Sequence, residues 1–476
     1  MHYKLHIPNA KPLDYTLNVY SPYDGSLVGT SDVLDKSGAE QALQNATDAF
    51  ADKSQWLDAE TRIAILEKTG KLMREHYDDL VMLAVQEGGK PLADSRVEMT
   101  RAIDSIKSCV ECIRSDSGRE IPMQLNAASS NRIAFTQKEP RGVVLAFSAF
   151  NHPINLIVHQ VAPAVATGCP VIIKPASDTP LSALRFVELL HEACLPKAWC
   201  QAIVLKNLDI AGDMVADKRV NFFSFIGSSQ VGWMLRSRLA AGTHCALEHG
   251  GVAPAIVAED ADLADILPLL AKGGFYHAGQ VCVSVQRVFA EASIVDEVAN
   301  GLASLAQQST VGNPAEENTD IGPLIRHKEV ERIDSWVQEA IAEGATLLCG
   351  GKAISKSCYM PTVLLNPNPS SKVSQREVFG PVICVYSYKN IDDAIQQANA
   401  LPFAFQASVC TKNIDTALYA SKHLAAAAVM INDHTAFRVD WMPFAGLRES
   451  GYGTGGIPYT FEDMQVDKLT VIRTKL

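Results

Sequence analysis

Three polar side chains with complementary chemistry stand out in the sequence: Cys282, Glu248 and Asn151. Cys282 ends the stretch Phe-Tyr-His-Ala-Gly-Gln-Val-Cys and follows Glu248 by 34 residues. A cysteine thiolate is a nucleophile, a partly buried carboxylate can act as a general base, and an asparagine amide can stabilise an oxyanion. Together the three residues predict nucleophilic catalysis with a stabilised oxyanion.

The motifs around these residues resemble those of the aldehyde dehydrogenase superfamily. Gly-Gln-x-Cys ends at Cys282, Glu-x-Gly-Gly begins at Glu248, and the resemblance extends from about residue 20 to about residue 460. It implies that Cys282 attacks the aldehyde and that Asn151 and the Cys282 backbone N–H hold the thiohemiacetal oxygen. It also implies that Glu248 activates water against the thioester. His249 and Val252 depart from the leucine and lysine often found there, and leave the base intact.

Each of these residues also has an ordinary structural interpretation when it is read alone. Most free cysteines are small buried hydrophobes, Asn151 can form an Asx turn before Pro153, and Glu248 can be a solvated strand-end residue. The odd number of eleven cysteines, without paired spacing, predicts reduced thiols. The Cys109–Cys112 pair has no second pair to complete a zinc site, so both are interpreted as helix residues and no metal is expected.

A loop with two glycines is a candidate for binding the phosphates of a dinucleotide. Phe225–Gly232 follows an apolar strand and opens a helix, where backbone amides and the helix dipole can face a phosphate. Gly227, Ser228 and Gly232 match the cofactor turn of the aldehyde dehydrogenases, although Ile226 replaces the frequent threonine. Read alone, such glycines are more often those of a plain turn.

Further cofactor contacts are implied by the resemblance. Lys174 and Ser177 match the ribose-binding segment, next to Phe147 at the end of the preceding strand, and Glu377 and Phe379 match the segment that holds the nicotinamide ribose and ring. Read alone, the lysine is equally a surface residue and the glutamate a charged turn entry. Ser177 neither binds two ribose hydroxyls as a carboxylate would nor repels a 2′-phosphate. The expected cofactor is therefore NAD or NADP, with the choice open.

Three basic residues suggest the kind of substrate. Arg101 and His152 match anion-binding positions in enzymes resembling phosphonoacetaldehyde dehydrogenase, and an arginine can hold an oxyanion group through two hydrogen bonds. Such enzymes tend to have an arginine just before the nucleophile, where this chain has Val281. Arg438 could supply that charge, or form a structural salt bridge with Asp440. The expected substrate is a small anionic aldehyde such as phosphonoacetaldehyde.

Other functions stay open at this level. A general, lactaldehyde or semialdehyde dehydrogenase would use the same catalytic residues. In a coenzyme-A-acylating enzyme a thiol would take the acyl group, and the presence of Glu248 argues against it. A non-catalytic protein of the same fold is disfavoured because Cys282, Asn151 and Glu248 are all present.

The elements that must position these residues follow an α/β pattern, in which short apolar runs alternate with amphipathic segments. Buried parallel strands are predicted at Val143–Phe147, Val171–Lys174, Phe222–Ile226 and Ala255–Val257. Helical spacing of apolar residues predicts one helix from Leu57 to about Gln86. The resemblance implies an aldehyde dehydrogenase-like fold with a Rossmann-like cofactor domain, an α/β catalytic domain and a small β oligomerisation arm.

Two segments break this alternation, Ile121–Gln137 and Lys468–Lys475, where apolar and polar residues are interleaved. They could form an exposed sheet that seeks a partner, or could edge the main sheet. In the family the corresponding segments form an arm that joins subunits, so a homodimer or homotetramer is expected. The expected domains are 1–118 with 138–247 for the cofactor, 248–456 for catalysis, and 119–137 with 457–476 for the arm.

Composition excludes several classes of function. The 476 residues are enough for two or three domains of the usual ~150 residues. With 42 basic and 53 acidic residues the net charge is -11, whereas nucleic-acid binding needs a concentrated basic surface. No apolar run approaches the ~20 residues of a membrane span, and the N-terminus lacks the apolar stretch of a signal peptide. The chain is expected to be cytoplasmic.

Overall fold

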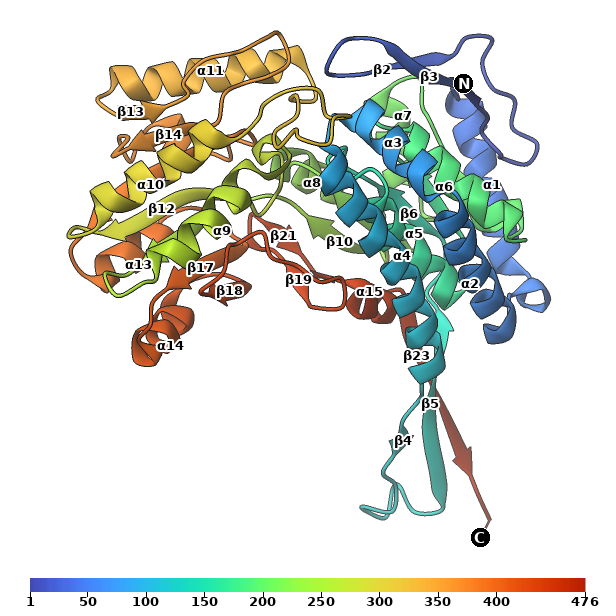
Figure 1. Ribbon diagram of the computed structural model, residues 1–476. Helices are drawn as coiled ribbons and strands as arrows, with labels where there is room; N and C mark the ends of the chain where they lie inside the picture. Colours follow the sequence, from blue (N-terminus) through green and yellow to red (C-terminus); the bar gives the residue numbers. More distant parts are fainter. Residues whose placement is uncertain (476) are drawn as a thin grey trace.

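Two large sheets lie next to one another, and a narrow β arm extends away from them (Figure 1). The computed structural model describes residues 1–475. Helices pack on both sheets, so the fold is α/β, as predicted. The helices are α1 (Lys36–Ala51), α2 (Ala59–Glu75), α3 (Tyr77–Gly88), α4 (Leu92–Ser115), α5 (Asn155–Thr167), α6 (Leu181–Glu192), α7 (Leu208–Val215), α8 (Ser229–Arg236), α9 (Leu263–Phe275), α10 (Val295–Gln308), α11 (His327–Ala342), α12 (Lys372–Gln375), α13 (Ile391–Asn399), α14 (Ile414–His423) and α15 (Ile457–Asp463).

The first sheet has six strands and is parallel except at one edge. Its order is β21 (Gly451–Tyr452), β10 (His244–Glu248), β9 (Phe222–Ile226), β6 (Val144–Phe147), β7 (Val171–Lys174) and β8 (Cys200–Ala202), with β21 antiparallel to β10. Alternate residues of β6 and β7 enter two different apolar clusters, one on each face. A strand buried on both faces is apolar along its length, which is why these strands were predictable from sequence.

The second sheet has seven strands. Its order is β13 (Thr346–Cys349), β14 (Thr362–Leu365), β15 (Val382–Tyr388), β12 (Val285–Glu291), β11 (Ala253–Val257), β17 (Gln406–Cys410) and β18 (Ala428–Ile431). All neighbouring strands are parallel except β13 and β14. The predicted strand Ala255–Val257 lies within β11.

The two sheets meet end to end at the candidate site. The carboxyl ends of β6, β7, β9 and β10 are in register, since Phe147 pairs with Lys174 and Phe225, and Ile226 pairs with Glu248. From the second sheet, the segments before the amino ends of β12 and β15 carry Cys282 and Glu377. Ligands of open α/β sheets bind beyond the carboxyl ends of the strands, so this junction is the expected place for a cofactor.

The segment predicted as helical from Leu57 to about Gln86 is helical, but it forms two helices, because the chain turns in the middle. α2 ends at Glu75 and α3 begins at Tyr77, and between them His76 has φ −106° and ψ 23°. The apolar spacing continues across this turn without glycine or proline, so no sequence signal marks it. Cys109 and Cys112 lie in α4, as expected for ordinary helix residues.

The arm is a separate three-stranded sheet of β4 (Glu120–Ile121), β5 (Arg132–Pro140) and β23 (Gln465–Arg473) (Figure 1). It does not edge either large sheet, so that alternative is wrong. Within Ile121–Gln137, β4 ends at Ile121 and β5 begins at Arg132, with bends and turns at 125–131 between them. The arm leaves apolar side chains exposed, among them Ile133 and Leu469. The predicted domain bounds and the role of the arm in joining subunits stay predictions.

Short strands complete the molecule. They are β1 (His2–Tyr3), β3 (Leu27–Ser31) and β2 (Leu17–Tyr20) in one sheet, β16 (Phe403–Ala404) with β20 (Leu447–Arg448), and β19 (Phe444–Ala445) with β22 (Thr454–Gly455). Among residues 1–475, none of the helices combines the length and apolarity needed to cross a membrane.

Candidate active site

The loop before Cys282 has an unusual backbone. His277, Ala278 and Gly279 all have left-handed φ angles, of 47°, 54° and 68°. A Cβ on Gly279 would overlap the carbonyl oxygen of Gly380, so this position admits only glycine. Gln280 fixes the loop from inside, since its Nε2 donates to the Pro323 carbonyl at 3.2 Å and its Oε1 accepts from the Ile325 amide at 2.9 Å. Cys282, the candidate nucleophile, is therefore carried by a loop that is fixed at several points.

The Cys282 thiol lies among charged groups. Burial, together with the carboxylates of Glu377 and Glu248, raises its pKa to about 12, and the charge of Arg438 acts in the opposite direction. Cys282 also packs against a small apolar cluster that contains Val281 and Phe444. The thiol is therefore neutral near pH 7, and attack on a carbonyl requires its proton to be removed.

Asn151 lies against the Cys282 loop. It is 4% exposed, in the segment between β6 and α5. Its Nδ2 donates to the carbonyl oxygen of Gln280 at 2.9 Å, so the amide nitrogen points at the residues that carry the thiol. One amide hydrogen is occupied by this bond, and the second can be donated to an oxyanion.

Glu248 ends β10 and is held in a tight space. A Cβ on Gly455, in β22, would overlap its Oε1, so the carboxylate lies against that strand. Burial raises the pKa of Glu248, while the positive charge of Arg438 lowers it. A carboxylate with a raised pKa accepts a proton more readily than a solvated one, which suits a general base.

Arg438 is the cation nearest to this chemistry. Its guanidinium carbon lies 3.5 Å from the centroid of the Phe444 ring, and its Nη2 lies 3.4 Å from Nδ1 of His159. The side chain is 10% exposed, and its Nε has no hydrogen-bond partner within residues 1–475. Burial lowers the pKa of Arg438, against the opposing charge of Glu248. A buried guanidinium with an unused donor can bind an anionic group of a substrate.

Arg101 differs from Arg438, because its guanidinium is already paired with the carboxylate of Asp440. Nε and Nη2 of Arg101 donate to the two carboxylate oxygens of Asp440 at 3.0 and 2.7 Å, and His159 Nε2 lies 2.8 Å from Oδ1. Burial opposes ionisation of Asp440, but His159 and Arg101 lower its pKa below the usual range. Arg438 approaches the same carboxylate only to 3.9 Å. The salt bridge considered for Arg438 is thus made chiefly by Arg101.

His152 lies beside an ion pair that sequence reasoning missed. Its Nδ1 is 2.5 Å from Nζ of Lys90, and Lys90 in turn binds the carboxylate of Glu98. Burial and the charge of Lys90 lower the pKa of His152 to about 4. The imidazole is therefore neutral at pH 7 and offers an anion no net charge. Lys90 gives no functional signal in the sequence, since the segment Gly-Gly-Lys-Pro around it is typical of a helix end.

Two candidate cofactor residues lie at the carboxyl end of β7. Nζ of Lys174 donates to the Pro175 carbonyl at 3.2 Å and lies 5.8 Å from the Phe147 ring. Burial lowers the pKa of Lys174, with the charge of Asp178 opposing. Ser177 is exposed on the loop that follows. A lysine with one weak backbone partner can turn towards a ribose hydroxyl, so these residues fit a dinucleotide.

Side chains of the protein pack closely against the glycine loop at Gly227 and Gly232. A Cβ on Gly227 would meet the Phe225 ring at 2.8 Å, and a Cβ on Gly232 would overlap the His249 imidazole. Nδ1 of His249 lies 2.9 Å from the Gly227 carbonyl oxygen. Ser228 precedes the first turn of α8 and is exposed, so the amides that open this helix can face a phosphate.

Glu377 and Phe379 lie in the segment before β15, and the charge of Glu377 acts on Cys282. Oε1 of Glu377 is buried without a partner among the described residues, and burial raises its pKa to about 8. A Cβ on Gly250 would overlap that carboxylate, which places it beside the Glu-x-Gly-Gly run. Phe379 has a φ of 47°, and its ring lies 5.8 Å from that of Phe150. An unsatisfied buried carboxylate fits a group that donates hydrogen bonds, such as a pair of ribose hydroxyls.

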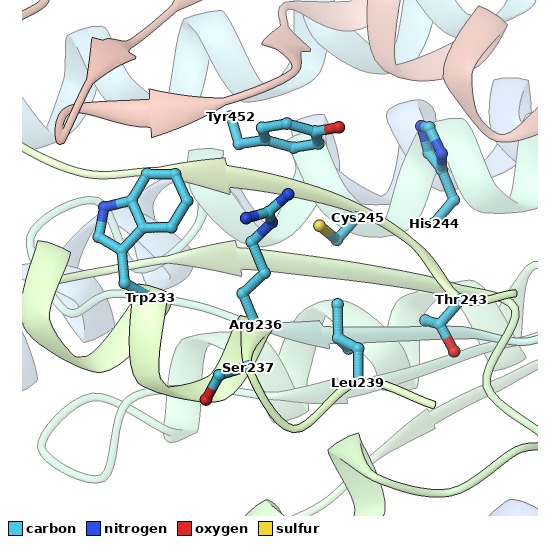
Figure 2. A pocket seen from close by; sticks show the side chains of 8 residues that line it. All are labelled: Trp233, Arg236, Ser237, Leu239, Thr243, His244, Cys245 and Tyr452. Atoms are coloured by element: carbon cyan, nitrogen blue, oxygen red, sulfur yellow. The ribbon is translucent and has the colours of Figure 1, made fainter. Parts of the chain in front are cut away.

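A separate pocket lies beside α8 (Figure 2). The guanidinium of Arg236 stands 4.4 Å from the Tyr452 ring centroid and 5.4 Å from that of Trp233. The residues that line it are Trp233, Arg236, Ser237, Leu239, Thr243, His244, Cys245 and Tyr452. They include none of the site residues predicted from sequence, so this pocket is distinct from the candidate active site.

Comparisons with known proteins identify the family of this chain. The family model described as "Aldehyde dehydrogenase family" matches residues 10–470. A 3-sulfolactaldehyde dehydrogenase of Priestia aryabhattai is 36% identical over 96% of this chain and 94% of its own length. A lactaldehyde dehydrogenase of Methanocaldococcus jannaschii is 34% identical over 96% and 97%. The crystal structure of a glyceraldehyde-3-phosphate dehydrogenase of the same archaeon, complexed with NADP, superposes with a TM-score of 0.92 at 32% identity over 97% of this chain and 100% of that one. The chain belongs to the aldehyde dehydrogenase family.

Proposed function

We propose that this enzyme oxidises a small aldehyde with an anionic tail to a carboxylate, using NAD or NADP. The observation that carries the choice of substrate is Arg438, a buried guanidinium with an unused donor whose charge acts on both Cys282 and Glu248. The sulfonate of 3-sulfolactaldehyde and the phosphate of glyceraldehyde 3-phosphate, substrates in the names of two similar proteins, are tails of this kind. A phosphonate tail, as in phosphonoacetaldehyde, has the same chemistry and belongs to the same proposal.

The dinucleotide would be held at both ends. Lys174 and Ser177 would face the adenosine ribose, and Gly227, Ser228 and Gly232 the phosphates. Glu377 would accept from the nicotinamide ribose, and Phe379 and Phe147 would pack against the cofactor. When bound, the nicotinamide supplies the hydride acceptor for the oxidation.

The protein residues would divide the remaining chemistry. Solvent first takes the proton of the Cys282 thiol. The thiolate then adds to the aldehyde carbon, and the Asn151 amide with the Cys282 N–H binds the resulting oxyanion. After loss of hydride the acyl group remains on the sulfur as a thioester. Glu248 then takes a proton from water, which attacks the thioester and releases the carboxylate.

Replacing Arg438 with methionine tests the anionic tail. The change removes the charge but keeps a long side chain on the Phe444 ring. Loss of one partner of a desolvated ion pair costs ~2–5 kcal/mol, so kcat/KM for 3-sulfolactaldehyde should fall roughly 30-fold or more relative to kcat/KM for propanal. The ratio is the measurement, because Arg438 also acts on Cys282 and Glu248 whatever the substrate.

Arg101→Met serves as the matched variant, since Asp440 already occupies that guanidinium. It should impair both aldehydes to a similar degree. If Arg438→Met leaves the ratio of kcat/KM for 3-sulfolactaldehyde to kcat/KM for propanal unchanged, the anionic-aldehyde proposal is wrong. The enzyme would then be better described as a general or lactaldehyde dehydrogenase, which the likeness to lactaldehyde dehydrogenases favours.

Cofactor choice is tested at position 177. A carboxylate in Ser177→Glu would accept bonds from ribose hydroxyls and repel a 2′-phosphate, shifting the preference towards NAD by on the order of 1–3 kcal/mol. The ratio of kcat/KM values for NAD and NADP measures the shift, and Ser177→Gln controls for side-chain size. Equal ratios in the wild type and Ser177→Glu would mean that residue 177 does not face the ribose.

We further propose a homodimer or homotetramer joined through the arm of residues 119–137 and 457–476, with 1–118 and 138–247 as cofactor domain and 248–456 as catalytic domain. The exposed apolar residues of β5 and β23 support an interface there. The eleven cysteines, all free within the described chain, support a reducing, cytoplasmic location.

A further inference from the structure

The turn between α3 and α4 carries two buried carboxylates that the chemistry above does not use. Glu87, near the end of α3, is 0% exposed, and Glu98, in the second turn of α4, is 2% exposed. Burying a carboxylate is costly unless hydrogen bonds or charges compensate, so the partners of these two groups indicate what they hold in place.

Glu98 holds the segment that contains Asn151. Its Oε1 accepts from the amides of Ile154 and Asn155 at 2.9 and 3.0 Å, the residues that begin α5. Its other oxygen binds Lys90, and Lys90 contacts His152. Within the described chain α5 has no side-chain cap of its own, so Glu98 supplies the missing acceptor from another helix. The end of the Asn151 segment is thereby fixed.

Glu87 does the same for the segment that contains Lys174 and Ser177. Its two oxygens accept from the amides of Leu181 and Ser182, each at 2.8 Å, at the first turn of α6. α6 also lacks a local side-chain cap among the described residues. The loop from β7 to α6 is thus fixed at its far end by the same helical hairpin.

The turn itself touches both segments and a third one. A Cβ on Gly88 would lie 3.7 Å from Thr179 and 3.8 Å from Pro153, in ordinary van der Waals contact with the two loops. A Cβ on Gly89 would meet Pro323 at 2.7 Å, and the Pro323 carbonyl is the acceptor for Gln280 in the Cys282 loop. One turn therefore lies against the three loops that converge on the site.

We infer that the α3–α4 hairpin positions the active site, with Glu98 as a positioning residue for Asn151 and Glu87 as one for the Lys174–Ser177 loop. This inference rests on the roles proposed above for Asn151 and Lys174. Because each carboxylate caps a different helix, the two should control different kinetic parameters: Glu98 the catalytic step, and Glu87 the binding of the dinucleotide.

The test compares Glu98→Gln with Glu87→Gln in the full chain, with propanal and 3-sulfolactaldehyde as substrates. In Glu98→Gln the amide NH2 would face the Lys90 ammonium and displace the Asn151 segment. A displacement of about 1 Å lowers kcat by on the order of 10- to 100-fold, with little change in the KM for the dinucleotide. In Glu87→Gln one of the two oxygens that cap α6 is replaced by an NH2 group. That group is a donor and would face a backbone N–H, which is also a donor. The dinucleotide KM, and its Kd from fluorescence quenching, should rise about 5- to 10-fold with kcat nearly unchanged.

Asp35→Asn is the matched control, because Asp35 caps α1 through the Gly38 amide at 3.0 Å and no site loop leads into that helix. It should lower Tm comparably and leave both parameters unchanged. Parallel changes of kcat and KM in both Glu variants, in proportion to the loss of Tm, would overturn the inference. Should a Gln variant not fold, Glu98→Asp and Glu87→Asp, which keep the charge on a shorter side chain, must show the same division between kcat and KM.

Asn151→Ala and Lys174→Met separate this inference from the function on which it rests. If both impair the enzyme while the Glu variants do not, the hairpin is not a positioning element and the proposed function stands. If neither impairs it, the roles of Asn151 and Lys174 are wrong, and the inference is overturned together with them.

Discussion

Replacing Cys282 with alanine is expected to abolish aldehyde oxidation and to leave dinucleotide binding nearly intact. The sulfur forms the bond to the substrate carbon, and no other side chain at the site can replace it, so kcat should fall by at least about 10³-fold. The thiol makes no contact that would hold the adenosine or phosphate groups of the cofactor. The rate is measured by the absorbance of the reduced cofactor, and binding by fluorescence titration with NAD and NADP.

Cys194→Ala is the matched control, because Cys194 is an exposed thiol that follows α6 and belongs to none of the site segments. It should keep wild-type activity. Retention of more than a few per cent of turnover in Cys282→Ala would mean that Cys282 is not the nucleophile. A loss of dinucleotide binding together with activity would instead show that the substitution disturbs the loop.

Glu248→Gln should separate the two halves of the reaction. Cys282 can still form the acyl-enzyme, but the water that hydrolyses it has lost its base. Rapid mixing should therefore show a burst of reduced cofactor, followed by a steady state slowed by about 10²–10⁴-fold. A variant with neither a burst nor slowed turnover would mean that another group activates water.

The pH profile gives an independent measure of the same residue. Burial raises the pKa of Glu248, and only its ionised form accepts a proton. Steady-state turnover should therefore rise with pH as this carboxyl ionises, at a higher pH than for a solvated glutamate. The Gln variant should lack this limb of the profile. Glu377 also has a raised pKa, of about 8, so Glu377→Gln must be measured alongside to assign the limb.

The parts of the fold that were predictable are those fixed by local burial. Val171–Lys174 and Phe222–Ile226 are strands with the predicted bounds, because a strand covered on both faces is mostly apolar, and only Lys174 and Ser224 depart from this here. The break between α2 and α3 was missed because the apolar face of the helix continues past His76. A turn of that kind is determined by tertiary packing and not by the residues within it.

The residues of the candidate site also fall into those that could be predicted from sequence and those that could not. Cys282, Glu248 and Asn151 were identifiable from short motifs, and the structure brings their segments together. The pairing of Arg101 with Asp440 was not predictable, because the two residues are 339 positions apart and nothing local marks them as partners. Glu98 likewise belongs to no motif in the sequence. Its importance lies in two backbone amides of another helix, which no sequence pattern records.

The arm also has a consequence for how the chain folds during synthesis. Lys468 of β23 binds Glu139 of β5, and these two residues are 329 positions apart. At roughly 5–20 residues per second on the ribosome, β5 would wait about 16–65 s before its partner strand is made. During that time one long edge, with its apolar side chains, would be unpaired. We expect closure of the arm to be a late step of folding, because β23 is made after the strands of both large sheets.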